Sequence, residues 1–145
     1  MRIYLAAPFF NLVQLFRVNH TRDILQRQPW PGTEFPPHVY CPHEHMILPT
    51  NATRAMRKDV FQSNMNEVRR SQVLVAILDE KDTGTIWEMG FAHDKVPTYG
   101  VYYDKGLKIN VMLAEGCIRI YDGVEAFERF LQGIPNTHWD PKEVY

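Results

Sequence analysis

Two carboxylates, Asp82 and Glu88, stand six positions apart in a segment whose residue types could act on a sugar. They follow an apolar run over 73–78, which predicts a buried strand that ends in an acidic loop and continues into a helix. Open α/β folds bind their ligands at such junctions. An ionised Glu88 could attack an anomeric carbon, and Asp82 could accept hydrogen bonds from sugar hydroxyls. Gly84, between them, would allow a ligand to approach the backbone closely.

The same carboxylates also have a purely structural interpretation. Thr85 and Glu88 match the S/T-x-x-E capping box, and Asp82 could be a helix cap. If Glu88 lies in the first turns of the helix, we expect the helix N-terminus to favour its ionised form. Asp79 and Glu80 in the same loop are expected to be partly ordinary solvated surface. Residue types alone leave catalysis and capping both open.

Two further polar side chains stand in apolar surroundings. Tyr4 lies near the carboxyl end of a predicted first strand, where its ring could join the core while its hydroxyl orients a carboxylate. Asn64 shares a predicted helix face with Val60 and Val68, and an amide on an apolar stripe needs a hydrogen-bond partner. That partner is either a neighbouring loop or a ligand.

His43 and His45 could suggest a metal site, but zinc needs a third protein ligand and the nearby Cys41 lies in a proline-constrained turn. We interpret this stretch, including Met46, as a loop at the mouth of a ligand pocket. The phosphate-binding patterns GxGxxG and GxxxxGK[ST] and the GxSxG pattern of serine hydrolases do not occur. We therefore predict that the protein uses no metal and no cofactor.

Composition narrows the class of protein. The 145 residues predict a single domain over 1–145, and a net charge of −1 without a basic stripe disfavours nucleic-acid binding. Two cysteines without a CxxC pair fit a reducing, cytoplasmic setting. The chain starts directly on a strand pattern and has no apolar run near 18 residues, so we expect neither secretion nor membrane spanning.

Strand and helix patterns alternate along the chain, which predicts an α/β fold with a five-stranded parallel sheet. With right-handed crossovers this gives a three-layer, doubly wound (flavodoxin-like or Rossmann-like) sandwich with strand order 2-1-3-4-5. The strands are expected at 2–6, 38–41, 73–78, 97–103 and 117–121. The helices are expected at 11–27, 51–70, 84–95, 108–115 and 123–132. Four apolar residues show helical spacing in the first helix: Leu12, Phe16, Ile24 and Leu25. The expected N-cap of the second helix is Thr50 or Asn51. The segment 42–50 is expected to be a loop.

Three segments of the chain resemble the nucleoside 2-deoxyribosyltransferase family. They are Ile3-Tyr-Leu-Ala-Ala-Pro-Phe-Phe10, Asp82-Thr-Gly-Thr-Ile-Trp-Glu-Met-Gly90 and Lys108-Ile-Asn-Val-Met112. The resemblance runs from Arg2 to Tyr145, and the acidic loop–helix segment is its most specific part. It implies an enzyme that transfers 2-deoxyribose between nucleobases.

The resemblance also implies roles for individual residues. Glu88 would be the nucleophile that attacks C1′ and forms a covalent glycosyl intermediate, as in a retaining glycosidase. Tyr4 would orient Glu88, and Asp82 would hold a sugar hydroxyl.

Asn110 would reach the 5′-hydroxyl from a neighbouring subunit, and the terminal carboxylate of Tyr145 would close the pocket. The implied partners are a deoxynucleoside donor, a base acceptor and further copies of the chain, in an oligomer built from dimers that could reach a hexamer. Phe9 and Gly84 would line the same pocket.

The chain departs from the family pattern where the base would bind. Asn64 stands where the family usually has an aspartate, and His43 to Met46 replace a region that often carries a glutamine. We therefore expect an altered range of bases, with a histidine near the base as a proton source. Two alternatives remain open: an N-glycosidase that hydrolyses deoxynucleosides or deoxynucleotides, and a non-catalytic nucleoside-binding domain.

Overall fold

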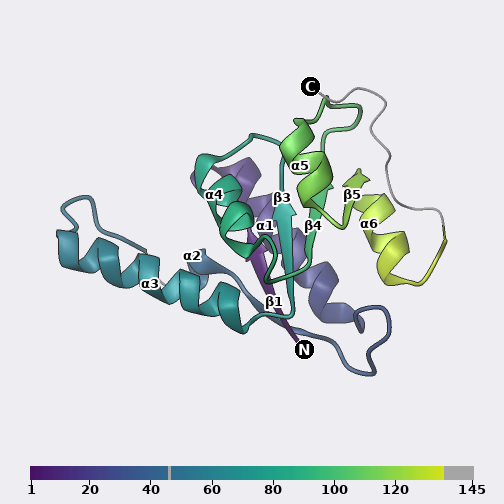
Figure 1. The fold of residues 1–145 in the computed structure, drawn as a ribbon, viewed down its shortest axis with the longest axis horizontal. Coiled ribbons are helices and arrows are strands. Elements are labelled where there is room, and N and C mark those ends of the chain that lie inside the picture. The colour runs from purple at the N-terminus through teal and green to yellow at the C-terminus, as the bar shows by residue number, and fades with distance from the viewer. Residues whose placement is uncertain (46, 136–145) are drawn as a thin grey trace.

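The computed structural model describes residues 1–45 and 47–135 and contains one five-stranded sheet (Figure 1). All four strand pairings are parallel, and the order is β2-β1-β3-β4-β5. This confirms the predicted doubly wound α/β fold. The strands are β1 (Arg2–Ala6), β2 (His38–Tyr40), β3 (Val73–Ile77), β4 (Thr98–Tyr102) and β5 (Arg119–Asp122).

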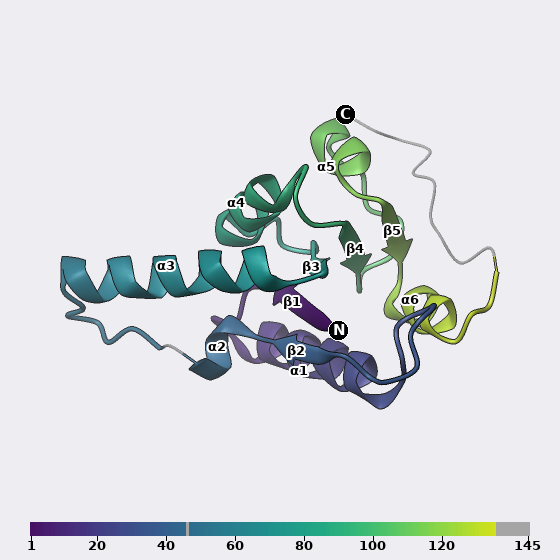
Figure 2. The same ribbon diagram turned by 60° about the horizontal axis from the view of Figure 1, so that its bottom comes forward.

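Helices cover both faces of the sheet, because successive side chains of each strand point to opposite faces. Ile3 and Leu5 of β1 pack in one cluster with residues of α1 and α6, whereas Tyr4 and Ala6 pack in a second cluster with residues of α3 and α4. Figure 2 shows α1 on one side of β1 and α3 and α4 on the other. The helices are α1 (Leu12–Arg27), α2 (Pro42–His45), α3 (Arg54–Arg70), α4 (Thr83–Ala92), α5 (Val111–Gly116) and α6 (Val124–Leu131). Within the described part of the chain, no helix is long and apolar enough to cross a membrane.

Several predicted boundaries were wrong. The segment 42–50 is not entirely a loop, since α2 occupies its first four residues. Helix α3 begins later than expected, because Thr53, and not Thr50 or Asn51, accepts a hydrogen bond from the backbone N–H of Met56. Helix α5 begins at Val111 because Asn110 caps it. In each case a local side-chain hydrogen bond or turn places the boundary, and apolar spacing does not reveal it.

The buried face of α1 also differs from the expected one. Of the four apolar residues at helical spacing, Ile24 and Leu25 are buried, but Leu12 is 84% and Phe16 63% exposed. The buried stripe of α1 instead contains Gln14, Val18 and Thr21 at helical spacing. Two polar residues therefore lie on the face that packs against the sheet. Thr21 is satisfied by the hydroxyl of Tyr103, at 2.8 Å.

Candidate active site

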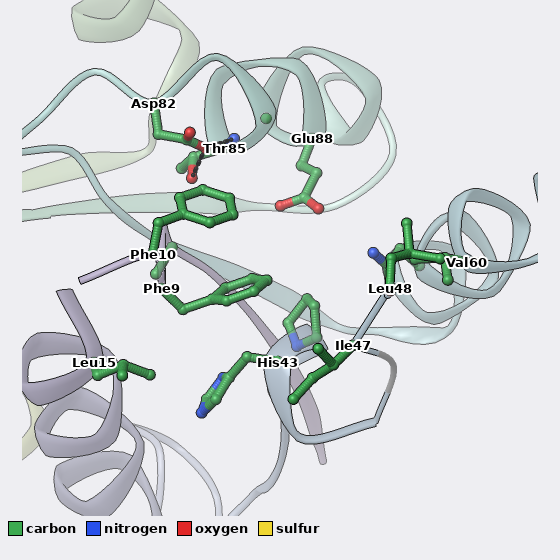
Figure 3. A pocket seen from close by; sticks show the side chains of 14 residues that line it. Phe9, Phe10, Leu15, His43, Ile47, Leu48, Val60, Asp82, Thr85 and Glu88 are labelled. Atoms are coloured by element: carbon green, nitrogen blue, oxygen red, sulfur yellow. Dashed lines mark hydrogen bonds between the residues drawn. The ribbon is translucent and has the colours of Figure 1, made fainter. Parts of the chain in front are cut away.

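A pocket of about 620 Å³ opens at the carboxyl ends of β1 and β3. Ligands of doubly wound sheets bind at this edge, where the chain leaves β1 and β3 toward opposite faces. Four segments line it. Residues of the β1–α1 turn meet the start of α4, and the walls are completed by the segment after β2 and by one face of α3. Figure 3 shows the Glu88 carboxylate pointing into the space beside Phe9 and Phe10.

The buried Tyr4 contacts Glu88, which lines this pocket. The Tyr4 hydroxyl donates a hydrogen bond of 2.7 Å to Glu88 Oε1, and Tyr4 itself is fully buried. Its ring stacks on Tyr40 of β2, with ring centroids 5.7 Å apart. A tyrosine held on both sides by packing has little freedom, so its hydroxyl fixes the direction of the carboxylate. The contact implied by the resemblance is therefore present.

Burial controls the ionisation of Glu88. Desolvation raises the pKa of Glu88 to about 7, although the Tyr4 hydrogen bond lowers it; the negative charge of Asp82 raises it further. Burial thus outweighs the effect that we expected of the helix N-terminus on the ionised form. Glu88 lies in the second turn of α4, beyond the first turn in which the helix dipole acts strongly. Burial therefore favours the protonated form of this carboxyl group far more than in an exposed glutamate.

Asp82 is the N-cap of α4, and the capping-box interpretation of Thr85 and Glu88 was wrong. One carboxylate oxygen of Asp82 accepts hydrogen bonds from the backbone N–H and the hydroxyl of Thr85, at 2.8 and 3.0 Å. Thr85 is thus the third helical residue and not the cap, which frees the Glu88 side chain for the pocket. Asp82 and Gly84 both line the pocket, and a Cβ atom at Gly84 would lie 3.1 Å from the Asp82 carboxylate.

The loop before Asp82 is anchored through Asp79. We expected Asp79 to be partly solvated, but its side chain is only 2% exposed. Its carboxylate accepts backbone hydrogen bonds from Tyr103 and Asp104 at the end of β4, and Arg17 lies 3.7 Å away. Burial raises the pKa of Asp79, and these donors and Arg17 oppose that shift. Asp79 therefore ties the acidic loop to the neighbouring strand end and holds its backbone in place.

Asn64 and His43 line the pocket on the side formed by α3 and the segment after β2, which we call the far wall. Asn64 lines the pocket, and its carbonyl oxygen accepts a weak 3.4 Å hydrogen bond from the Tyr40 hydroxyl, so a neighbouring side chain satisfies it only in part. His43 also lines the pocket and packs against Phe9, with ring centroids 5.6 Å apart. Its Nδ1 atom is buried without a hydrogen-bond partner among the described residues. Burial lowers the pKa of His43, so its ring is neutral at pH 7.

Two other predicted site residues of the described chain, His45 and Asn110, are not in the pocket lining. His45 is exposed and stacks on Tyr40 at 4.4 Å, so His43 and not His45 is the histidine of the pocket. Asn110 caps α5 by accepting a hydrogen bond from the N–H of Met112 at 2.9 Å. Its expected role in a neighbouring subunit remains a prediction. Met46 and Tyr145 lie outside the described residues.

The apolar lining of the pocket was largely missed by sequence reasoning. Phe9 was expected and lines the pocket, as does Phe10 beside it, with ring centroids 4.9 Å apart. Ile47 and Leu48 form part of the opposite wall. The aromatic pair directly after a strand was a usable signal, but the two aliphatic residues stand in a segment without periodicity. In the described ranges, no group of three histidine, cysteine or acidic side chains is arranged to hold a metal ion.

The fold and the pocket together define an α/β protein with a desolvated carboxylate at the carboxyl edge of its parallel sheet. A sequence model of the family described as Nucleoside 2-deoxyribosyltransferase matches residues 3–115. Because this match covers well over half of the chain, the protein belongs to the nucleoside 2-deoxyribosyltransferase family, whose enzymes are generally pentosyltransferases. A search of curated proteins returns no match.

Solved structures share the fold at low sequence identity. The 2-deoxyribosyltransferase of the psychrotolerant bacterium Bacillus psychrosaccharolyticus aligns with a TM-score of 0.78 and 23% identity, over 97% of this chain and 100% of that one. A conserved protein from Enterococcus faecalis V583 aligns with a TM-score of 0.58 and 22% identity, over 100% and 81%. The 2-desoxiribosyltransferase from Leishmania mexicana aligns with a TM-score of 0.50 and 19% identity, over 84% and 75%.

Proposed function

We propose that this protein transfers 2-deoxyribose between nucleobases by a retaining double displacement on Glu88. The observation that carries the proposal is the 2.7 Å hydrogen bond from the buried Tyr4 hydroxyl to a carboxylate that faces the pocket. A carboxylate held in one direction, with one oxygen left to react, meets the requirement for in-line attack on a sugar carbon. Family membership supports the same reaction class.

In the first half-reaction, an oxygen of ionised Glu88 attacks C1′ while the C1′–N bond to the base breaks. The base leaves with the electron pair of that bond and takes up a proton from solvent. The transition state resembles an oxocarbenium ion, so it gains stability from the nearby negative charge of Asp82. Asp82 also has a lone pair free for a sugar hydroxyl, because its helix-capping bonds use only one of its two oxygens.

In the second half-reaction, a ring nitrogen of another base attacks C1′ from the face opposite Glu88. The C1′–O bond breaks, Glu88 recovers its charge, and the incoming base loses its proton. Two inversions give net retention at C1′. Water competes with the base as acceptor, so the apolar walls formed by Phe9, Phe10, Ile47 and Leu48 favour transfer over hydrolysis.

Recognition of the base falls to Asn64 and His43 on the far wall. An amide and a neutral imidazole both donate and accept hydrogen bonds, so they can read the edge of a base. Neither is a strong acid at neutral pH, since the pKa of His43 is lowered by burial. This changes our expectation that a histidine would supply the proton: we propose that His43 orients the base rather than protonates it.

We propose that Asn110 of a neighbouring subunit and Tyr145 complete the sugar site, and that the enzyme works in the cytoplasm as a homo-oligomer without a cofactor. Asn110 is partly exposed at the start of α5, where a neighbouring subunit could use it.

A base-exchange assay tests the function. 2′-Deoxyinosine or thymidine is incubated with and without adenine, and products are separated by chromatography. A new deoxynucleoside that forms only with adenine is the expected result. Free base and free deoxyribose at the same rate with or without adenine would instead identify the N-glycosidase. Binding of the nucleoside without any cleavage would identify a non-catalytic domain.

A further inference from the structure

Gln14 is a buried polar residue that lies outside the pocket lining. It is 7% exposed and occupies the third position of α1. The backbone N–H of Gln14 donates to the Asn11 side chain at 2.9 Å, which caps the helix. In a standard capping box the side chain at this position reaches back to the N–H of the cap residue. The Gln14 side chain makes different contacts, so capping does not explain its burial.

The amide of Gln14 joins two loops that line the pocket. Its carbonyl oxygen accepts a hydrogen bond of 2.7 Å from the backbone N–H of Phe10, in the β1–α1 turn. Its NH₂ group donates to a carboxylate oxygen of Glu80, in the loop that leads to Asp82. One planar amide thus spans the gap between the first and third strand ends. We call this arrangement the Gln14 bridge.

The far end of the Gln14 bridge is itself held. Arg17, one turn further along α1, lies 3.9 Å from Glu80 and 3.7 Å from Asp79. Asp79 is anchored by backbone N–H groups at the end of β4. The side chain of Glu80 is 43% exposed. Its carboxylate nevertheless faces the guanidinium of Arg17 and the amide of Gln14, which are both nearly buried. The bridge connects the backbone of the exposed residue Phe10 to a loop that these contacts fix.

The near end of the bridge needs such support. Phe10 lines the pocket and is 75% exposed, so the core does not hold its ring in place. Its ring packs on Phe9 at 4.9 Å. Figure 3 shows the ring on the same side of the pocket as Asp82 and Thr85, facing the carboxylate of Glu88. The position of this ring in the pocket lining depends on the backbone of residue 10, and the Gln14 amide holds that backbone.

We propose that Gln14 is a positioning residue that holds Phe10 beside the Asp82–Glu88 pair and thereby limits hydrolysis of the glycosyl intermediate. The inference rests on the proposed transferase function. In the side reaction, a water oxygen bonds to C1′, the C1′–O bond to Glu88 breaks, and the water proton passes to solvent. The products are free deoxyribose and regenerated Glu88. An apolar ring beside the ester disfavours the water molecule that this reaction needs.

A charge swap tests the bridge. In Q14E two carboxylates face each other at the position of the amide–carboxylate contact, so we expect the bridge to open. In the double variant Q14E/E80Q the donor and acceptor exchange places, and Glu at position 14 still accepts the Phe10 N–H. At a fixed, subsaturating acceptor concentration, we expect Q14E to raise the ratio of free deoxyribose to new nucleoside by about tenfold. The double variant should return this ratio to within about twofold of wild type.

The controls separate positioning from stability and from the function itself. Q26E adds the same charge to an exposed site on α1 and should leave the ratio and the melting temperature unchanged. If Q14E does not fold, E80A removes the far anchor without touching the core and should raise the ratio in the same direction. An unchanged ratio in the folded single variant, or no recovery in Q14E/E80Q, overturns the inference. If wild type yields neither product, the proposed function is wrong instead.

Discussion

The hydroxyl of Tyr4 lies 2.7 Å from the carboxylate of Glu88, although 84 positions separate the two residues in the chain. β1 carries the tyrosine and the helix after β3 carries the glutamate, and these strands are neighbours in the sheet. The contact decides two properties of the carboxylate. It sets its direction, and it counteracts part of the pKa increase that burial imposes.

Replacing the proposed nucleophile should abolish transfer. We expect E88A to lose at least about 10⁴-fold in kcat, as enzymes do when a nucleophile is removed. Steady-state base exchange measures the loss. E34A, at an exposed loop position, is the matched control and should keep full activity. Turnover of E88A close to that of wild type would reject the double-displacement mechanism.

The activity of wild type should depend on the ionisation of Glu88. With a pKa of about 7, kcat/KM should fall about tenfold per pH unit below that value and level off above it. In Y4F the hydrogen bond that lowers this pKa is lost, so the acid limb should move to higher pH. Activity above the limb should drop by about 10-fold, since one hydrogen bond to a charged group is missing. A pH–rate profile of both proteins tests this. An unshifted limb in Y4F would show that another group titrates.

The opposite shift is expected when the neighbouring charge is removed. Asp82 raises the pKa of Glu88, so D82N should move the acid limb to lower pH. Asparagine is also a good helix cap, so the melting temperature should change little. If Asp82 holds a sugar hydroxyl, KM for the nucleoside should rise by about 10-fold or more. Unchanged kinetics together with unchanged stability would mean that Asp82 is only a cap.

The raised pKa also predicts a pH dependence of stability. Between the ordinary value of 4.5 and about 7, the native state holds the Glu88 proton that the unfolded state has released. The contribution of Glu88 to the unfolding free energy is thus fully present below pH 4.5 and is lost as the pH rises through 7. E88Q cannot ionise, so its stability relative to wild type should increase over this range. Denaturant unfolding at pH 5 and pH 8 measures the difference. A constant difference would mean that Glu88 titrates normally.

The amide on the far wall should govern the choice of base. We expect N64D to broaden or accelerate base use, because a carboxylic acid at this position can give a proton to the leaving base and an amide cannot. The comparison is kcat/KM for a panel of purine and pyrimidine deoxynucleosides. N66D, on an exposed part of the same helix, is the control for the added charge. No change for any base would mean that Asn64 is a structural residue that serves the Tyr40 hydroxyl.

Much of the architecture followed from local patterns. Strand and helix periods alternate clearly enough that a parallel sheet in the order 2-1-3-4-5 was the expected result, and the structure has it. The same patterns placed Tyr4, Asp82 and Glu88 at the carboxyl edge of that sheet. Apolar spacing is a property of a short window, so it survives in the sequence and can be read there.

Tertiary structure alone decided the details of the site. Which histidine faces the pocket, how far Glu88 is desolvated and what the Gln14 amide joins all depend on residues distant in the chain. Desolvation and long-range hydrogen bonds arise only after the strands are packed, so no local pattern encodes them. The sequence by itself therefore determined the fold and the chemical groups of the site. Packing determined how those groups ionise, which way they point and which residues surround them.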